Sequence, residues 1–414
     1  SQLLNANTTS TQPYWLVNEK SLGTFNFTDQ TLVGKPENDP PVVANFKFNI
    51  GGSDFTFSRS LVYKYEDAVK GEIYRPLEVA PAVMVNIEEP VYVFSSSAPK
   101  AIKVNLKSAI ANAKGSAKLI APTGWKISPA DFSFELKNPG DEISATFSVT
   151  PPSGNISSAV DTLNAVVAMN SNSYNRGVKT IAYDHIHAIT IFPFAKSELV
   201  TVPLKFTGKN IGYVKGAGDL VPEMLQQIGY KISMLSNDEI ASGNLQQYDA
   251  IITGIRLYNT DERIKNLNEK LLEYVKNGGT LVTQYNTTAD LITEKMGPYP
   301  FKLSRDRVTD ENATVNFIDP KIPLLNTPNK ITAKDFDGWI QERGLYFLTA
   351  VDSNYQKVFT MNDPNEKPLD GSLIVAKYGK GKYVYTGLSF FRELPAGVPG
   401  AYRLFVNLIS KNEN

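Results

Sequence analysis

The sequence predicts a multidomain chain in which two β-sandwich modules are followed by an α/β domain with a doubly wound sheet. Three observations support this prediction. The 414 residues exceed what one compact core usually organises. From residue 14 to about 190, apolar residues recur at every second position, as they do in β-strands. After residue 208, strands alternate with amphipathic helices, which indicates a parallel sheet covered on both faces.

The two sandwich modules are predicted at residues 1–78 and 79–195. In the first, ANFKFNIGGSDFTF (44–57) alternates apolar and polar residues around a Gly-Gly turn, which predicts a β-hairpin. In the second, alternation is clearest at 102–106, 132–136 and 143–149, and the turn signals PTG, NPGD and PPSG separate the strands. Short strands at regular spacing without a helical pattern are typical of immunoglobulin-like sandwiches.

The α/β domain is predicted at residues 196–414. Its expected strands are 210–214, 230–235, 249–254, 278–286 and the hairpin 372–386. Its expected helices follow the loop at 216, run from Ile264 to Val275, and close the chain at 401–409. Asp219 is placed to cap the first of these helices, and Gly278 ends the second.

Composition excludes several classes of function. The chain has no cysteine, so thiol nucleophiles, thiolate metal sites and disulfides are excluded. Its 42 basic and 42 acidic residues balance, which makes nucleic acid an unexpected partner. No apolar stretch approaches the length of a membrane span. The start at SQLLNANTTST without a methionine leads us to expect a processed or truncated piece of a larger protein.

Polar residues follow the predicted parallel strands at their carboxyl ends. They are Lys215 to Asp219 after the first strand, Arg256, Tyr258 and Asn259 after the third, and Gln284, Tyr285 and Asn286 after the fourth. Because such strand ends converge on one edge of a doubly wound sheet, we expect a crevice lined by amides, phenols and a guanidinium. This chemistry suits ligands rich in hydroxyl groups. The alternative is that these side chains only cap the sheet and bond to adjoining loops.

The order of elements, with a long helix leading into GGTLVTQYN (278–286), resembles the class I glutamine amidotransferase-like fold. In that family, the position of Tyr285 typically holds a cysteine nucleophile on a tight turn between a strand and a helix. The phenol of a tyrosine, with an ordinary pKa of about 10, is a poor nucleophile near neutral pH. The resemblance therefore implies a domain of this shape without the thiol mechanism.

Three later segments interleave arginines, carboxylates and aromatic residues. Their side chains are candidates for a second wall of the site: Arg305, Arg307, Trp339, Glu342, Arg343, Arg392 and Glu393. Arginine can bind ligand carboxylates in pairs, and aromatic faces can stack on sugar rings. A pair such as Glu342 and Glu393, or Asp310 and Glu311, could instead hydrolyse a glycan if it faced an open cleft at about 5 to 9 Å separation. The further alternative is a buried ion-pair network that holds the loops.

Long motifs in these segments resemble a known family. They are GPYPFKLSRDRVTDE (297–311), DFDGWIQERGLYF (335–347), GLSFFRELPAGVPGAYRLF (387–405) and, earlier, VKGEIYRPL (69–77). Together they are similar to the C-terminal region of large PIG-L (LmbE-like) deacetylase-family proteins of Bacteroidetes, over nearly the whole chain. Members of that family remove acetyl groups from N-acetylglucosamine-type substrates with an N-terminal zinc domain that carries His-Pro-Asp-Asp and His-x-x-His motifs. Neither motif occurs here, and the only two histidines are His185 and His187.

The resemblance implies a non-catalytic accessory region, with no cofactor of its own, that binds or positions a glycan or glycoconjugate. Zinc is expected only in a deacetylase domain outside this chain, which would be its protein partner. The sandwiches resemble spacer modules of secreted glycan enzymes, so a periplasmic or secreted location is expected. The alternatives are a carboxylate-dependent glycan hydrolase in the α/β domain, and a structural region that docks the catalytic domain or forms an oligomer.

Overall fold

The computed structural model describes residues 9–21, 23–154, 157–186 and 188–411. Most of its regular structure is β-strand, arranged in many sheets, and helices are few. The chain divides into two compact units, each assembled from separate segments: the first from Ser1–Pro90, Pro99–Thr150 and Thr162–Ser197, the second from Val91–Ala98, Pro151–Asp161 and Glu198–Asn414. The three-domain division expected from the sequence stays a prediction. No described helix is long and apolar enough to cross a membrane.

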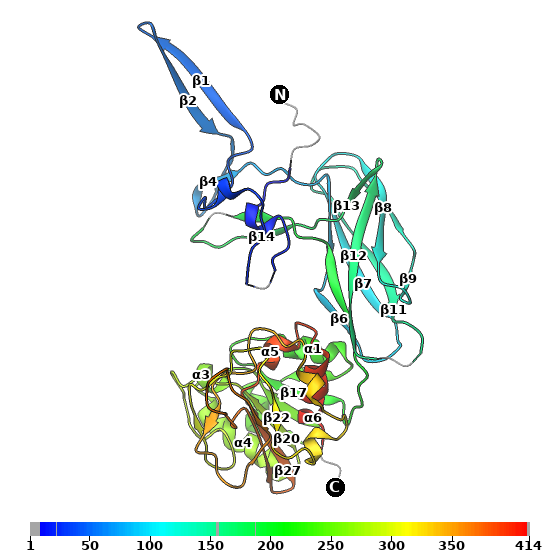
Figure 1. The fold of residues 1–414 in the computed structure, drawn as a ribbon, viewed down its shortest axis with the longest axis vertical. Coiled ribbons are helices and arrows are strands. Elements are labelled where there is room, and N and C mark those ends of the chain that lie inside the picture. Colours follow the sequence, from blue (N-terminus) through cyan, green and yellow to red (C-terminus); the bar gives the residue numbers. More distant parts are fainter. Residues whose placement is uncertain (1–8, 22, 155–156, 187, 412–414) are drawn as a thin grey trace. The chain divides into compact units, whose positions relative to one another are not determined.

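The N-terminal part of the first unit contains two separate hairpins instead of a sandwich (Figure 1). Their strands are β1 (Val43–Ile50) with β2 (Ser53–Ser60), and β3 (Val62–Asp67) with β4 (Gly71–Pro76). Two short 3-10 helices precede them, η1 (Tyr14–Leu16) and η2 (Gln30–Leu32). The Gly-Gly turn predicted from the sequence is confirmed, because Gly51 and Gly52 both have positive φ and Ile50 pairs with Ser53. The sequence led us to expect a first sandwich here. Alternation predicted the strands correctly, but it does not show whether a second sheet covers them.

The rest of the first unit is a β-sandwich (Figure 1). One sheet has the order β5-β7-β11-β9, and the other contains β10-β8-β12 with β13 on β12. The strands of the two sheets are β5 (Val83–Ile87), β7 (Lys100–Ser108), β8 (Ala113–Ile120), β9 (Lys126–Ser128), β10 (Phe132–Leu136), β11 (Glu142–Thr150), β12 (Ala159–Met169) and β13 (Asn172–Tyr174). The predicted alternation is confirmed on β7, where Ile102, Val104 and Leu106 are fully buried. A small hairpin joins β14 (Lys179–Ile181) and β15 (Ile189–Ile191).

The second unit is built around a seven-stranded sheet of order β18-β17-β19-β20-β27-β26-β24. The strands are β17 (Asn210–Val214), β18 (Lys231–Met234), β19 (Ala250–Thr253), β20 (Thr280–Gln284), β24 (Gln356–Lys357), β26 (Leu373–Tyr378) and β27 (Gly381–Thr386). Neighbours from β18 to β27 are parallel, whereas β26 is antiparallel to both β27 and β24. The predicted hairpin at 372–386 is confirmed as β26 and β27.

Helices cover both faces of this sheet (Figure 1). They are α1 (Val221–Gln227), α2 (Asn237–Ser242), α3 (Leu257–Thr260), α4 (Ile264–Lys276), α5 (Phe390–Glu393) and α6 (Pro399–Ile409). Alternate residues of each strand face opposite cores, as the pleat requires. Ile252 and Val282 join the core formed with α1 and α6, while Ile251 and Leu281 join the core formed with α2 and α4.

Short elements complete the second unit. They are β6 (Val91–Phe94), β16 (Lys196–Thr201), β21 (Lys302–Leu303), β22 (Asn316–Phe317), β23 (Leu348–Thr349), β25 (Phe359–Thr360), η3 (Pro323–Leu325) and η4 (Ala333–Phe336). β6 is parallel to residues 198–201 of β16 and is attached to α1 by Gln227, whose amide bonds the backbone of Val91 and Val93. Between β20 and β26 the chain forms only short elements, so this long segment consists mostly of loops.

Candidate functional site

Three neighbouring strands deliver polar residues to one edge of the main sheet. Because β19, β20 and β27 are parallel, their carboxyl ends lie at the same edge. Arg256 lies three residues beyond β19, and Tyr285 directly follows β20. The backbone N–H of Arg256 donates to the carbonyl of Tyr285 at 2.7 Å. The backbones of Arg256 and Tyr285 thus lie side by side at this edge.

The other predicted residues at these strand ends bond to the protein itself. Tyr258 is fully buried, and its hydroxyl donates to Asn268 Oδ1 at 2.6 Å. Asn259 donates to the carbonyls of Thr287 and Ala289.

The two remaining amides, Gln284 and Asn286, are also buried. Gln284 donates to the Tyr213 hydroxyl and the Thr253 carbonyl, and Asn286 accepts from the N–H of Tyr258. In this structure the amides cap the sheet edge, as in the alternative considered from the sequence.

Tyr285 instead belongs to a cluster that opens to solvent. We define the Tyr285 cluster as Arg256, Tyr285, Glu342, Tyr346, Phe391 and Arg392, all of which are partly exposed. The rings of Tyr285 and Phe391 are stacked, with centroids 5.4 Å apart and an interplanar angle of 12°. The ring of Tyr346 lies 5.7 Å from that of Tyr285 on a tilted plane. Arg392 lies over the ring of Phe391 at 4.9 Å. Three aromatic rings and two guanidinium groups thus share one surface.

The charges of the cluster are arranged around the Tyr285 phenol. Glu342 Oε1 accepts from Arg392 Nε at 2.7 Å and from the Ser389 hydroxyl at 3.1 Å. Burial raises the pKa of Tyr285 above its usual value, and the nearby guanidinium groups of Arg256 and Arg392 oppose that rise. At neutral pH the phenol is therefore protonated and can donate as well as accept a hydrogen bond.

Two features of the cluster are unusual for a purely structural surface. Arg256 Nε is buried but has no hydrogen-bond partner among the described residues. Arg256 and Tyr346 have positive φ, of 57° and 51°, and so does Gln341, the residue before Glu342, at 67°. Such backbone costs about 1–3 kcal/mol at each non-glycine residue and concentrates at functional sites. An unpaired buried donor beside strained backbone is what a site that awaits a ligand acceptor would present.

Glu393 lies beside the cluster but faces inward. It is completely buried, Oε2 accepts from the N–H of Ile340 at 3.0 Å, and Oε1 has no partner among the described groups. Burial is the main reason that the pKa of Glu393 is raised to about 8; the charge of Glu342 acts in the same direction, while the hydrogen bond from Ile340 and the charges of Arg343 and Arg392 oppose the rise. The carboxyl group is therefore protonated at neutral pH. Its lack of exposure keeps it from touching a bound molecule.

Arg343 and Trp339 support the loop that supplies Glu342 and Tyr346. Arg343 is buried, and its guanidinium donates to the carbonyls of Ala313 at 3.0 Å and Phe336 at 2.5 Å. Trp339 is buried against Phe336 and Phe390. Both residues were predicted to contact ligand, and in the structure both are internal supports of the loop. The remaining predicted residues, Arg305 and Arg307, are exposed side chains outside the Tyr285 cluster.

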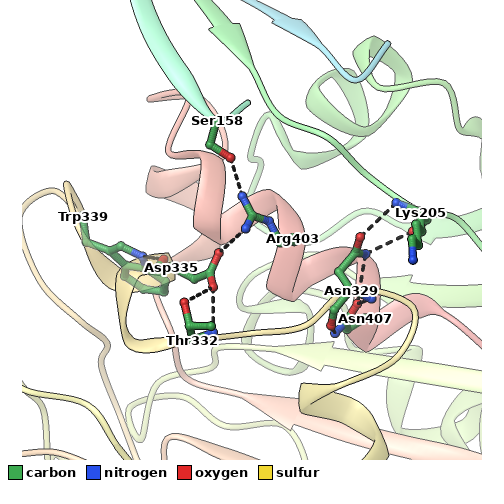
Figure 2. Close-up of polar contacts among 8 residues, drawn as sticks. All are labelled: Ser158, Lys205, Asn329, Thr332, Asp335, Trp339, Arg403 and Asn407. Carbon is green, nitrogen blue, oxygen red and sulfur yellow. Dashed lines mark hydrogen bonds and ion pairs between the residues drawn. The ribbon is translucent and has the colours of Figure 1, made fainter. Parts of the chain in front are cut away.

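Figure 2 shows how the start of the same loop is held on α6. Arg403 forms an ion pair with the buried Asp335 at 3.1 Å and also bonds the hydroxyl of Ser158. Asp335 Oδ2 accepts from the backbone N–H and the hydroxyl of Thr332. The indole of Trp339 donates to the carbonyl of Asp335 at 3.0 Å.

A second anchor uses Asn407 of α6, which bonds Asn329, which in turn bonds the backbone of Lys205 (Figure 2). These contacts fix the segment from Asn329 to Trp339 before it reaches Glu342.

We expect Gly400→Ala to loosen this anchor, because a Cβ at Gly400 would lie 2.0 Å from the carbonyl oxygen of Asp335. Overpacking of this kind costs about 1–3 kcal/mol, and a backbone contact this close places the change at the upper end. Gly338→Ala is the matched comparison, because its Cβ would meet nothing within 4 Å and only its φ of +72° opposes the change. Urea unfolding measures the free energy of unfolding of both variants. If Gly400→Ala lowers this free energy by no more than Gly338→Ala does, the packing of Gly400 against Asp335 is contradicted.

Within the part of the chain that the structure describes, no three His, Asp or Glu side chains are placed to share an ion. His185 is exposed beside the ring of Tyr183, and His187 lies outside the described residues.

Sequence reasoning missed Phe391 and Tyr346. Both residues occur in the motifs quoted above, but only the fold brings their rings next to Tyr285. The adjacent Phe390 and Phe391 in SFFRE gave a local indication, because neighbouring residues of this kind point in different directions: Phe390 is buried and Phe391 is partly exposed.

No protein-family model matches the chain, and no curated protein matches its sequence. Among solved structures, it is similar to a cold-adapted beta-galactosidase from Rahnella sp. R3, with 16% identity, 49% of this chain and 32% of that chain covered, and a TM-score of 0.31. It is also similar to the exo-beta-1,4-mannosidase Op5Man5 from Opitutaceae bacterium strain TAV5, with 13% identity, 50% of this chain and 37% of that chain covered, and a TM-score of 0.31. A human F-spondin reeler domain is similar at 10% identity, with 29% of this chain and 88% of that chain covered and a TM-score of 0.17. The chain spans about a third of the length of each glycosidase. At these TM-scores the similarities assign neither a fold family nor an activity.

Proposed function

We propose that this chain is a non-catalytic accessory region that binds a glycan or glycoconjugate at the Tyr285 cluster. The observation that carries the proposal is the stacked pair Tyr285 and Phe391, partly exposed and flanked by Arg256 and Arg392. Aromatic faces bind the apolar faces of sugar rings, while guanidinium and carboxylate groups bond their hydroxyl groups. The resemblance of the sequence motifs to PIG-L (LmbE-like) proteins suggests N-acetylated amino sugars as the ligand class.

The unpaired Arg256 Nε favours a ligand that carries a hydrogen-bond acceptor. A buried donor without a partner costs about 1–3 kcal/mol, which a ligand oxygen would recover. The carbonyl oxygen of an acetamido group or a ring hydroxyl would serve. Glu342, held by Arg392 and Ser389, adds an acceptor for hydroxyl or amide N–H groups on the same surface.

We also propose that the second unit is a degenerate class I glutamine amidotransferase-like domain. The order β18-β17-β19-β20 and the helices on both faces support this assignment. The residues after Tyr285 form a loop up to Pro300 and not a helix, and Tyr285 does not have a positive φ. A strained turn that would present a nucleophile is thus not built at this position.

The hydrolase alternative has less support. It needs two carboxyl groups that a substrate can reach, but Glu393 is completely buried. Its neighbour Glu342 is engaged by Arg392. In the proposed role the zinc chemistry belongs to a deacetylase domain of the same protein outside this chain, and the location is periplasmic or secreted.

Calorimetry of the intact chain with N-acetylglucosamine oligomers tests the proposal. We expect binding that Tyr285→Ala weakens by at least roughly tenfold, the equivalent of about 1.4 kcal/mol. Tyr378→Ala is the control, because Tyr378 is also partly exposed but lies at the end of β26, at the opposite edge of the sheet. The site is ruled out if the intact chain does not bind these oligomers, or if Tyr285→Ala and Tyr378→Ala lose the same affinity.

A further inference from the structure

The β1–β2 hairpin has one apolar face and one polar face. The apolar face carries Ala44, Phe46, Phe48, Ile50, Phe55 and Phe57. Phe46 pairs with Phe57 and Phe48 with Phe55, and each phenylalanine is between 44% and 54% exposed. Lys47 and Thr56 form the neighbouring cross-strand pair on the polar face. All sixteen residues of the two strands are exposed, so neither face is covered by described residues.

This arrangement is poorly suited to a hairpin that stands alone. A two-stranded sheet is only marginally stable in water unless its apolar face packs against something. Contiguous exposed apolar patches on soluble proteins mark interaction sites. The hairpin therefore needs an occupant for its phenylalanine face.

An apolar cavity lies at the base of the same hairpin. It has a volume of about 360 Å³ and is lined by residues of the first unit. Pro40 and Pro41 of its wall come just before β1, and Ser60, the last residue of β2, continues into Leu61 and Val62. The rest of the apolar lining consists of Trp15, three further prolines, Leu77, Ala188 and Ile189. The phenylalanine face thus runs along an arm that has Ile50 at its tip and the apolar cavity at its base.

We propose that two copies of this chain form a two-fold dimer in which the hairpins pack antiparallel, phenylalanine face to phenylalanine face. Each strand has eight residues and extends roughly 26 Å. Antiparallel packing of arms of equal length brings the tip of each, with Ile50, to the base of the other. Each tip then enters the partner's cavity, and the two contacts are identical, as a closed two-fold dimer requires.

The buried area is sufficient for such a dimer. Half-exposed phenylalanines each leave roughly 100 Å² to be covered, so four of them with Ile50 and Leu61 offer roughly 600 Å² per copy. The roughly 1,200 Å² of the pair reaches the lower bound of specific interfaces.

Charge favours the antiparallel arrangement over the parallel one. Arg59 lies on the phenylalanine face at its base, where it pairs with Ala44. Parallel packing would place the two Arg59 side chains next to each other, whereas antiparallel packing separates them by the length of the arm.

Analytical ultracentrifugation of the full chain tests the dimer. We expect a concentration-dependent dimer whose dissociation constant rises roughly a hundredfold in the double variant Phe48→Gln, Phe55→Gln. The matched control is Lys47→Gln, Thr56→Gln, the adjacent cross-strand pair on the polar face, which should dimerise as the unmodified chain does. A monomer at all concentrations would overturn the proposal, as would equal effects of the two double variants.

Cysteine cross-linking tests the direction of packing, and the chain offers a background with no cysteine. Ile50→Cys with Leu61→Cys should form a disulfide-linked dimer under oxidation. The two positions in one copy are separated by the length of β2, far beyond the roughly 7 Å between Cα atoms that a disulfide allows. Cross-linking by Ile50→Cys alone, as efficient as that of the pair, would show tip-to-tip packing and overturn the antiparallel arrangement. Binding of a monomeric chain to neutral lipid vesicles through Phe48 and Phe55 would assign the face to a membrane surface instead.

Discussion

Glu393→Gln is expected to stabilise the chain near neutral pH and to change its stability little at pH 5. In the folded state burial raises the pKa of Glu393 to about 8 from its ordinary value of 4.5. Between these two values the folded state keeps a proton that the unfolded state has released. The free energy of unfolding therefore falls as pH rises, by about 1.4 kcal/mol for each pH unit, until the folded pKa is passed.

Glutamine is neutral at every pH and can still accept from the N–H of Ile340. The variant should gain roughly 3 kcal/mol over the unmodified chain at pH 7 and under about 1 kcal/mol at pH 5. Urea unfolding at both pH values measures the difference. Glu366→Gln, at an exposed position, serves as the control, and its free energy of unfolding should stay within about 0.5 kcal/mol of that of the unmodified chain at both pH values. A gain that is the same at pH 5 and pH 7 would show that Glu393 is ionised in the folded chain.

Arg343→Leu is expected to destabilise the second unit by about 3 kcal/mol or more. The variant leaves the buried carbonyls of Ala313 and Phe336 without their donor, and each such loss costs about 1–3 kcal/mol. It also removes the guanidinium that lies over Phe336 and Trp339.

Arg305→Leu is the matched control, because Arg305 is an exposed arginine for which a change within about 0.5 kcal/mol is expected. Chemical unfolding followed by tryptophan fluorescence reports both variants. If Arg343→Leu unfolds at the same denaturant concentration as Arg305→Leu, the loop does not depend on Arg343 and its assignment as a support is wrong.

The regular elements of the second unit were predictable because their signals are local. Alternation and turn residues predicted β17 and the β26–β27 hairpin, and helical periodicity ending at Gly278 predicted α4. Asp219 was predicted to cap the helix that follows it; its carboxylate accepts from the N–H of Val221, although the residue at the N-cap position is Leu220. In each case the residues that decide the structure lie within a few positions of it.

The candidate site was only partly predictable, because its members come from loops. Arg256 and Tyr285 could be paired from the sequence, since parallel strands bring their carboxyl ends to one edge. Sequence could not show that Asn286 and Gln284 find internal partners while Tyr285 remains partly exposed. It also could not separate Glu342, whose side chain is 12% exposed and pairs with Arg392, from Glu393, which is completely buried 51 positions later in a similar polar motif.

The first unit shows a different limit. The alternation in residues 44–57 predicted the β1–β2 hairpin and its turn, and both are confirmed. A periodicity of two identifies an apolar face but not its partner, and a sandwich was the natural expectation for covering that face. Among the described residues the face has no cover, which is why a second copy is proposed as the occupant.

Fluorine NMR of the chain labelled with fluorotyrosine tests the central claim most directly, with resonances assigned through tyrosine-to-phenylalanine variants. On titration with an N-acetylglucosamine tetramer, the signals of Tyr285 and Tyr346 should shift together and saturate, while that of Tyr378 stays in place. Shifts at Tyr378 that match those at Tyr285, or a Tyr285 signal unmoved by any amino-sugar oligomer, would contradict binding at this edge of the sheet.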